Sequence, residues 1–407
     1  MPFINSLLYY IIAGAFIFNC NSMWKVATNT SKYGTTVFLV MIIAMGLLVL
    51  LEIQDNNSKL KVKSVYSLLF LVLYAIIYCL IVPNMIQKVA PIILVAISAI
   101  LLVDCGGIIT CKNILICYKN LIVIIAGISL LFWIFGSLLH IIHSNGTVIS
   151  AWSNYASIPS YYDMYFEAHA NSNTFLGTIT QNTSVFTEPP MAAVNFSLAL
   201  VFTLFDKENT NKKINFQRII LILSLFSTLS VYGLIFLVLY YIFTRSEKDR
   251  DRKQFDRILK IIFVCLICIF IIYIGYYIVS DKFNSASGLV RLDDYRAGFM
   301  AWLNHPVFGN GIDNLKSIQI YMSSWRSANL GYSSPIMGLL AQTGIYGTIL
   351  YIYCIFKGII LSIKSCKFEN ILLITTLILI IFICMVQYTY IYIFLMILVS
   401  RKNIVDI

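Results

Sequence analysis

Residues 219–243 read IILILSLFSTLSVYGLIFLVLYYIF, an apolar run without a charged side chain. A run of this length suffices for one helix to cross a bilayer. Basic residues border it on both sides: Lys207, Lys212, Lys213 and Arg218 come before it, and Arg245, Lys248, Arg250, Arg252, Lys253, Arg257 and Lys260 follow. Because basic residues gather on the cytoplasmic side of a membrane, both flanks are expected inside. The run is therefore predicted to enter and leave on one side, as a hairpin of two short helices.

Small and hydroxylated residues mark the middle of this run: Ser227, Thr228, Ser230 and Gly233. The break between the two helices is predicted there. Such a break persists in a membrane only where protein or a wet cavity satisfies its backbone polar groups. The last apolar run, 371–400, repeats the pattern between Lys364 and Lys367 on one side and Arg401 and Lys402 on the other. It is predicted to break near Gln387–Tyr388.

The composition excludes a soluble enzyme, a disordered chain and a secreted disulfide scaffold. Of 407 residues, 59% are hydrophobic and 12% charged, against roughly 45–50% and about 25% in soluble domains. Eight further apolar runs predict single spans: Phe3–Cys20, Thr35–Ile53, Ser64–Val82, Pro91–Thr110, Leu121–Ile142, Pro190–Phe205, Ile261–Ser280 and Gly344–Ile363. With two hairpins of two helices each, this predicts an all-α polytopic integral membrane protein of about 12 segments. Residues 1–407 form a single polytopic domain in this prediction, with both termini in the cytoplasm.

Two long exterior loops remain, at residues 143–189 and 281–343, and loops of such length usually carry function. In the second loop an apolar stripe at helical spacing predicts an amphipathic helix, formed by Leu292, Tyr295, Phe299 and Trp302. Pro306 should end this helix, and Gly309 and Gly311 should form a turn after it. That turn follows no strand, so it is not a dinucleotide-binding fingerprint.

Arg291 opens the predicted helix and is the first candidate for chemistry. Its guanidinium can hold two oxygens of a pyrophosphate at once, and Arg296 and Arg326 can join it. The alternative is that these arginines pair with Asp293, Asp294 or anionic lipid head groups. Asp293 and Arg296 are three residues apart, which suits a surface pair. Adjacent helical residues diverge by about 100°, so the two aspartates favour surface pairing over a metal site.

The first loop holds no Lys or Arg, and its carboxylates stand among aromatic residues. Asp163 and Glu167 lie close in sequence to the aromatic residues Trp152, Tyr155, Tyr161, Tyr162, Tyr165 and Phe166. Aromatic faces with scattered carboxylates suit sugars; an interfacial aromatic belt is an equal alternative. Glu188 lies at the entrance of a span, where proximity to hydrocarbon favours a raised pKa and a general-base role. The alternative is a carboxylate favoured by the helix dipole.

The histidines give weaker signals. His140 and His143 stand three apart at a helix end, but no third ligand is evident, and we expect no metal. His305 precedes Pro306, so a helix-ending role is favoured over a base.

Several motifs together resemble the bacterial O-antigen polymerase and O-antigen ligase superfamily. Arg291, followed four residues later by Tyr295, and then Trp302–Gly311 (WLNHPVFGNG), are similar to its signature of Arg, aromatic, Pro and Gly-x-Gly. Gln342–Gly347 (QTGIYG) is similar to the motif with which a membrane span begins in this superfamily.

Two further motifs and two departures refine the resemblance. Phe186–Pro189 (FTEP) resembles the F-x-E-P found before a span in many polymerases, and Ser227–Ser230 falls where the family has a Thr-x-Ser break. Ser333-Ser334, however, occupies the place of the His-Asn on whose His ligases rely, and the first loop lacks the Arg that many members have. Both departures favour a polymerase over a ligase and leave the catalytic base open.

The resemblance implies a glycosyltransferase-C-like fold and a metal-independent glycosyltransferase without cofactor. It would polymerise undecaprenyl-pyrophosphate-linked glycans into O-antigen or a similar polysaccharide at the periplasmic face of the inner membrane. A chain-length regulator would be its candidate protein partner, and no nucleic acid would take part. The alternatives are a ligase that transfers the polysaccharide to lipid-A core and, in a different class, a flippase of lipid-linked oligosaccharides. Arg291 and Glu188 are the candidate catalytic residues. The candidate substrate-binding residues are Arg296, Arg326, Asp293, Asp294, Tyr295, Trp302, His305, Gly309, Gly311 and Asp163.

Overall fold

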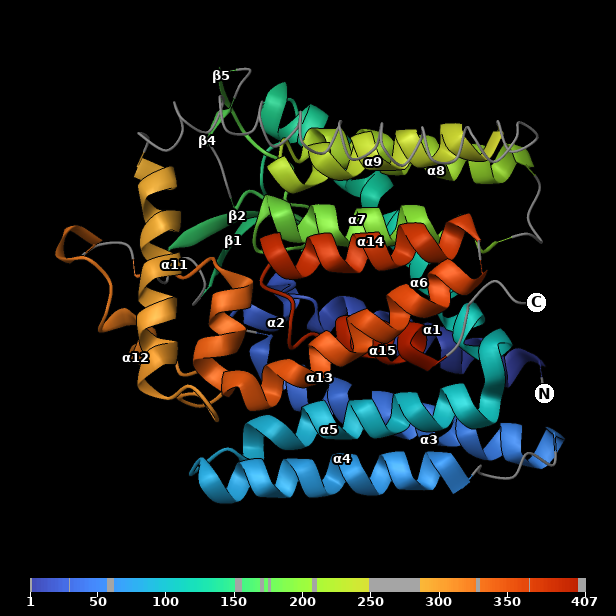
Figure 1. Cartoon of the computed structure of the whole chain (residues 1–407). Helices are drawn as coiled ribbons and strands as arrows, with labels where there is room; N and C mark the ends of the chain where they lie inside the picture. The colour runs from blue at the N-terminus through green and yellow to red at the C-terminus, as the bar shows by residue number, and fades with distance from the viewer. Residues whose placement is uncertain are drawn as a thin grey trace. The chain divides into compact units, whose positions relative to one another are not determined.

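The computed structural model of the chain is mostly helical (Figure 1). It describes residues 2–28, 30–56, 62–150, 156–168, 172–174, 177–206, 211–248, 286–326, 330–365 and 367–401. The chain divides into two compact units. The first comprises Met1–Leu234, Ile352–Ile380 and Val386–Ile407, and the second comprises Ile235–Tyr351 and Ile381–Met385.

Four helices within the described residues are long and apolar enough to cross a membrane: Ser31–Gln54, Ser64–Ile81, Ile86–Leu138 and Pro335–Ser365. Shorter apolar helices accompany them at Ile4–Asn19, Pro189–Phe202, Val231–Thr244, Phe368–Ile383 and Tyr390–Arg401. The chain is thus a helical protein with the features of a membrane protein, as the sequence predicts. The predicted span Ile261–Ser280 lies outside the described residues.

Most predicted spans in the first unit match a helix. In chain order the helices are α1 (Pro2–Asn19), α2 (Met23–Val26), α3 (Gly34–Asn56), α4 (Val62–Ile81), α5 (Ile86–Leu101), α6 (Gly107–Phe132), α7 (Pro189–Phe202), α8 (Asn211–Ser227) and α15 (Tyr390–Arg401). Helix α6 packs against α1, α7 and α8, and α5 packs against α4 and α15. The two runs predicted as Pro91–Thr110 and Leu121–Ile142 belong to one long helical stretch, interrupted where Gly107 has φ of 70°.

The apolar run 219–243 is broken where the sequence predicts. Helix α8 ends at Ser227, and α9 (Val231–Lys248) begins four residues later. Asn182 of the first loop donates its backbone N–H to the Ser227 carbonyl (3.1 Å) and its amide to the Ser227 hydroxyl (2.9 Å). Gln181 donates to the Leu229 carbonyl (3.3 Å). Protein groups therefore satisfy this backbone, which is the condition for an irregular segment at membrane depth.

The last apolar run is also interrupted as predicted, between α14 (Phe368–Ile383) and α15. The backbone N–H of Tyr390, the first residue of α15, donates to the Asn19 side chain at the end of α1 (2.9 Å). The first N–H groups of a helix have no partner within the helix, and here a side chain distant in sequence accepts one of them.

The first loop contains strands that the sequence analysis did not predict. β1 (Gly146–Ile149), β2 (Ser157–Tyr161) and β3 (Tyr165–Phe166) form an antiparallel sheet, and β4 (Ser172–Thr174) pairs with β5 (Gly177–Ile179). Bridges between Ser22 and Phe186 and between Ala27 and Ser150 join this loop to the segment after α1. The strands pair with their neighbours in the loop and show no long alternating apolar pattern that would predict them.

In the second unit, α11 (Ala286–Asn304) confirms the predicted helix of the second loop and its end before Pro306. It is followed by α12 (Lys316–Gln319), a 3₁₀ turn (Ser324–Arg326) and the start of α13 (Pro335–Ser365). The apolar stripe is partly exposed, with Leu292, Tyr295 and Phe299 between 42% and 48% accessible. The packed core is built instead from three alanines, one isoleucine and one tyrosine: Ala297, Ala301, Ile318, Tyr332 and Ala341.

Candidate functional site

Helix α11 carries its two adjacent aspartates on its buried side. Asp293 is 5% exposed and Asp294 is fully buried, which corrects the expectation that both carboxylates lie on the helix surface. The reason is that Ala297 and Ala301, on the packed face of the helix, let other segments approach closely. Buried carboxylates need charged or hydrogen-bonding partners, and Arg326 supplies the charge.

Arg326 is a buried cation rather than a surface one. Its guanidinium forms an ion pair with Asp294, lies 3.6 Å from Asp293 and donates to the Val290 carbonyl (3.2 Å) and to the Gly331 carbonyl. With its side chain fully buried, this guanidinium is engaged by protein groups. Arg326 therefore joins α11 to the segment that leads into α13.

Asp293 also interacts with Ser323 and Arg296. It accepts hydrogen bonds from the Ser323 N–H (3.0 Å) and hydroxyl (2.6 Å) and pairs with Arg296 at 3.1 Å. Burial raises the pKa of Asp293, but these hydrogen bonds and the Arg296 charge outweigh burial, so the pKa lies below its ordinary value. The predicted Asp293–Arg296 pair is thus confirmed. The Arg296 side chain is 53% exposed and retains access to solvent.

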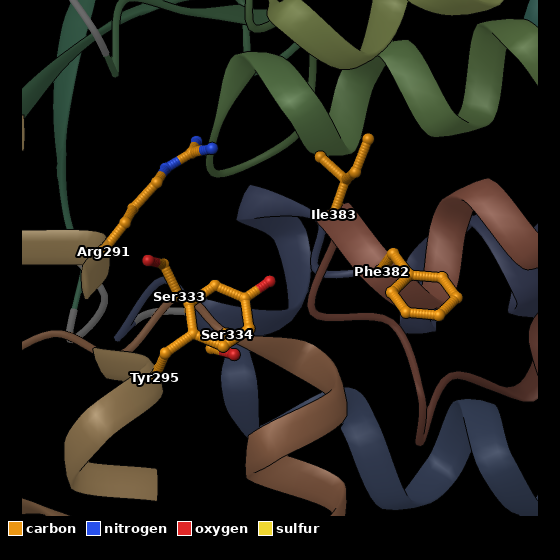
Figure 2. Close-up of a pocket in the computed structure, with 6 residues that line it drawn as sticks. All are labelled: Arg291, Tyr295, Ser333, Ser334, Phe382 and Ile383. Carbon is orange, nitrogen blue, oxygen red and sulfur yellow. The ribbon is translucent and has the colours of Figure 1, made fainter. Parts of the chain in front are cut away.

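Arg291 has a different environment from the other two arginines. It is exposed and makes no hydrogen bond or ion pair with any residue that the structure describes. With Tyr295 it lines a cavity of about 130 Å³ whose other walls are Ser333, Ser334, Phe382 and Ile383. Figure 2 shows Arg291, Tyr295 and the two serines on one side of this cavity and the two apolar residues on the other. An arginine without a partner beside a cavity is the clearest candidate for binding an anion.

The sequence analysis did not name Ser333 and Ser334 as candidate site residues, although both line the cavity. Ser333 donates both its N–H (2.8 Å) and its hydroxyl (2.7 Å) to Asp294, so the buried ion pair holds this segment beside α11. Their position in the sequence could have indicated them, because Ser333 and Ser334 occupy the place where ligases of the resembling superfamily have His-Asn. Phe382 and Ile383 come from the end of α14, and no local pattern connects them to Arg291.

The two glycine motifs of the resemblance meet in space. Asn310 N–H donates to the Ala341 carbonyl, and Gly311 N–H to the Gln342 carbonyl, both at 2.9 Å. Gly309 has φ of 71° and Gly344 φ of 64°, and a Cβ on Gly344 would lie 2.2 Å from the Val307 carbonyl oxygen. Gly309 and Gly311 thus allow two backbone segments to cross at close range.

Trp302 and His305 lie near this crossing. The Trp302 indole donates to the Pro306 carbonyl (3.1 Å), and the ring packs against the core of the second unit. His305 is exposed, and its carbonyl accepts the Gly309 N–H (2.9 Å), so it takes part in the turn after α11. This supports the interpretation of His305 as a residue of the helix end.

Glu188 and Asp163 belong to the first unit. Glu188 directly precedes α7, in an extended conformation, and its side chain makes no hydrogen bond that caps the helix. It is half-buried. Asp163 lies in the turn between β2 and β3, where its carboxylate accepts the Ser160 hydroxyl (2.8 Å) and its carbonyl accepts the Trp24 indole N–H (2.7 Å).

The aromatic residues of the first loop are mostly packed together. Tyr161, Tyr165 and Phe166 are at most 4% exposed, and the Tyr161 and Tyr165 rings lie near Phe132. Burial and the Glu167 carboxylate raise the pKa of Tyr161, whose hydroxyl donates to Glu167 at 2.8 Å. These faces are therefore occupied by protein, and Tyr162, 65% exposed, keeps an accessible ring. Trp152 and Tyr155 lie outside the described residues.

No group of three His, Cys, Asp or Glu side chains in the described part of the chain is arranged to hold a metal ion. The site is thus composed of an arginine without a side-chain partner among the described residues, two serines and aromatic and aliphatic walls, and a buried ion pair supports it. Comparison of the sequence with protein-family models and with curated proteins finds no match.

Proposed function

We propose that this chain is a polysaccharide polymerase, a glycosyltransferase that joins oligosaccharide repeats carried on undecaprenyl pyrophosphate. The observation that carries the proposal is Arg291, an exposed guanidinium with no partner among the described residues, beside a cavity lined by two serines. The resemblance of its surrounding motifs to the O-antigen polymerases supports the same conclusion. No metal or cofactor is part of the proposal.

In the proposed reaction a hydroxyl at the non-reducing end of one lipid-linked repeat attacks the sugar carbon bonded to the pyrophosphate of the growing chain. The carbon–oxygen bond to the pyrophosphate breaks, and the lipid pyrophosphate leaves with the bonding electrons. Arg291 meets the negative charge that grows on this leaving group, and a preorganised cation stabilises such charge more in the transition state than in the ground state. The hydroxyl proton passes to a general base.

Glu188 remains our candidate for that base. Its half-buried carboxylate at the entrance of α7 can accept a proton, and the Phe186–Pro189 motif resembles the family's F-x-E-P. Because Glu188 and Arg291 belong to different units, the assignment rests on these two features and on no distance between them.

The proposal includes the twelve-segment topology, with both termini cytoplasmic and the long loops in the periplasm. Contacts in the first unit support it because they join segments expected on the same side. Lys119 pairs with Asp206, and Arg401 with Asp104, all at predicted cytoplasmic ends. The Ser22–Phe186 and Ala27–Ser150 bridges connect segments predicted outside. The proposal places the protein in the bacterial inner membrane, with a chain-length regulator as its candidate partner.

The test is a glycan ladder from a deletion strain complemented with variants at matched membrane expression. Arg291→Ala is expected to leave only single-repeat product, since losing a preorganised donor to developing charge costs about 3–4 kcal/mol, or roughly 10²–10³ in rate. Arg291→Lys should rescue weakly, because an ammonium offers one point charge where the guanidinium offers a fork.

Lys316→Ala is the matched control, an exposed cation of the same unit that does not line the cavity. It should leave the ladder intact. A normal ladder from Arg291→Ala would remove Arg291 from the site. In the deletion strain itself, full-length lipid-linked chains would indicate a ligase instead, and the absence of lipid-linked product outside would indicate a flippase.

A further inference from the structure

Glu167, in the first loop, has a carboxylate whose two oxygens differ in their surroundings. The Oε1 atom accepts hydrogen bonds from the Ser137 hydroxyl (2.6 Å) and from the Tyr161 hydroxyl (2.8 Å). The Oε2 atom makes no hydrogen bond in the part of the chain that the structure describes, and the described residues do not enclose it. The residue as a whole is half-buried. One oxygen is therefore fixed in place, and the other is open to a donor from outside the chain.

The charge of this carboxylate has no counter-ion among the described residues. The first loop contains no Lys or Arg, and no basic side chain elsewhere in the described chain pairs with Glu167. A partly buried carboxylate is costly unless donors or cations compensate its charge. The two O–H donors on Oε1 supply part of that compensation, but an uncharged glutamine would accept both of them as well. The open, charged Oε2 is thus a feature that the internal contacts do not use.

An exposed aromatic ring belongs to the same cluster of side chains. The Tyr162 ring is 65% exposed, and its centroid lies 6.1 Å from that of Phe132. The Phe132 ring also lies 5.6 Å from that of Tyr161, whose hydroxyl binds Glu167. Tyr162 has φ of 53°, which a tyrosine rarely adopts, and its N–H donates to the Asn145 side chain (2.6 Å). The turn is therefore fixed with an accessible ring next to the carboxylate cluster.

We infer that Glu167 binds hydroxyl groups of the acceptor oligosaccharide and that a sugar ring of this acceptor packs on Tyr162. The inference rests on the proposed function, in which the acceptor is the incoming lipid-linked repeat. A sugar hydroxyl donates to a carboxylate oxygen in a charge-assisted hydrogen bond, and the apolar face of a sugar suits an aromatic ring. Glu167 is a substrate-binding residue in this assignment, and Glu188 keeps the role of base.

The competing explanation is that Glu167 only joins the loop to the helical turn Trp133–Leu138, which contains Ser137. The Tyr165 hydroxyl also meets that of Ser137 (2.8 Å), so it contributes to the same junction without touching Glu167. If the junction were all that mattered, Glu167→Gln would change little, because the glutamine oxygen still accepts both hydroxyls. Tyr165→Phe would then have the larger effect.

The experiment measures the binding of a free oligosaccharide to the full-length protein in detergent, by saturation-transfer NMR. The probe is the single repeat that accumulates on lipid in the deletion strain, released by mild acid so that it lacks the pyrophosphate. Glu167→Gln should weaken its binding about tenfold, which corresponds to one charge-assisted hydrogen bond. Tyr162→Ala should weaken it about threefold, through the loss of one aromatic contact.

Glu369→Gln and Tyr165→Phe are the controls. Glu369 is another half-buried carboxylate, in the first turn of α14, and its replacement should leave the affinity unchanged. Tyr165→Phe should lower the melting temperature, because it removes the buried hydroxyl that meets Ser137, and should change the affinity less than twofold. The melting temperature of Glu167→Gln should stay near that of the wild type.

Four outcomes would overturn the assignment of Glu167: no binding of the free repeat by the wild type, wild-type affinity in Glu167→Gln, or an equal loss of affinity in Glu369→Gln or in Tyr165→Phe. Failure of the proposed function has a different signature. A deletion strain that accumulates no single lipid-linked repeat would refute the polymerase, whereas a repeat that accumulates but binds without regard to Glu167 would refute only this inference.

Discussion

The three arginines of the second loop have the same side chain and different physical roles. Arg326 is buried against Asp294, Arg296 is half-exposed and pairs with the buried Asp293, and Arg291 has no side-chain partner among the described residues. Burial and neighbours, rather than residue type, decide which guanidinium is available to a ligand. Among the described residues, the site at this scale is therefore an accessible cation beside a buried ion pair.

The first prediction at this scale concerns Asp294. Asp294→Asn removes the charge that compensates Arg326, and breaking a buried ion pair by removing one partner typically costs about 3–5 kcal/mol. We expect a loss of that size in the free energy of unfolding, measured by denaturant titration of the detergent-solubilised protein. The segment that holds Ser333 should loosen as well, because both of its hydrogen bonds to this loop end on Asp294.

Arg296→Gln is the matched comparison within the same cluster. It disrupts the pair with Asp293, but the Arg296 side chain is 53% exposed, and exposed pairs contribute at most about 1 kcal/mol. Equal losses from the two variants would contradict the distinction between a buried and a surface pair.

At the scale of elements, the turn after α11 and the middle of α13 form one structural feature. Pro306 and Val307 accept the N–H groups of Ile345 and Tyr346, at 3.0 and 2.9 Å. Gly344 interrupts the α13 helix with φ of 64° and ψ of −168°, which frees this backbone to pair with the turn. The positive φ of Gly344 thus allows α13 to form hydrogen bonds with the turn after α11.

The second prediction concerns this junction. Gly344→Ala places a Cβ 2.2 Å from the Val307 oxygen and 2.4 Å from its carbon, and neither backbone atom can move without separating the elements. We expect severe loss of folded protein, measured as membrane yield and monodispersity in detergent. Gly127→Ala, inside α6 where a Cβ meets nothing within 4 Å, should be neutral or stabilising by up to about 1 kcal/mol. Normal yield from Gly344→Ala would mean that the close crossing is not essential.

At the scale of the whole molecule, the interrupted run 219–243 decides the topology. Its break is held by Asn182 and Gln181, from a loop predicted outside, while its flanks carry basic residues predicted inside. Every segment after the run changes side if it crosses the membrane once instead of returning.

The prediction is that reporter fusions after Lys213 and after Lys253 both score as cytoplasmic, because eleven basic residues border the run. A fusion within the first loop, at Asn145, should score as periplasmic and serves as the positive control. An exterior score after Lys253 would overturn the twelve-segment arrangement.

The sequence by itself determined the helical membrane-protein class, the interruptions of both apolar runs and the helix of the second loop. Each follows from hydrophobic length or from local residue types such as Ser, Gly and Pro, which act on the nearest turn of chain. Only the tertiary structure decided that Asp294 is buried with Arg326, 32 residues away, and that Ser333 binds the same carboxylate across 39 residues. It also decided that the two glycine motifs cross and that Ser334 shares a cavity with Arg291. Side-chain partners so far apart are selected by packing, which no local pattern encodes.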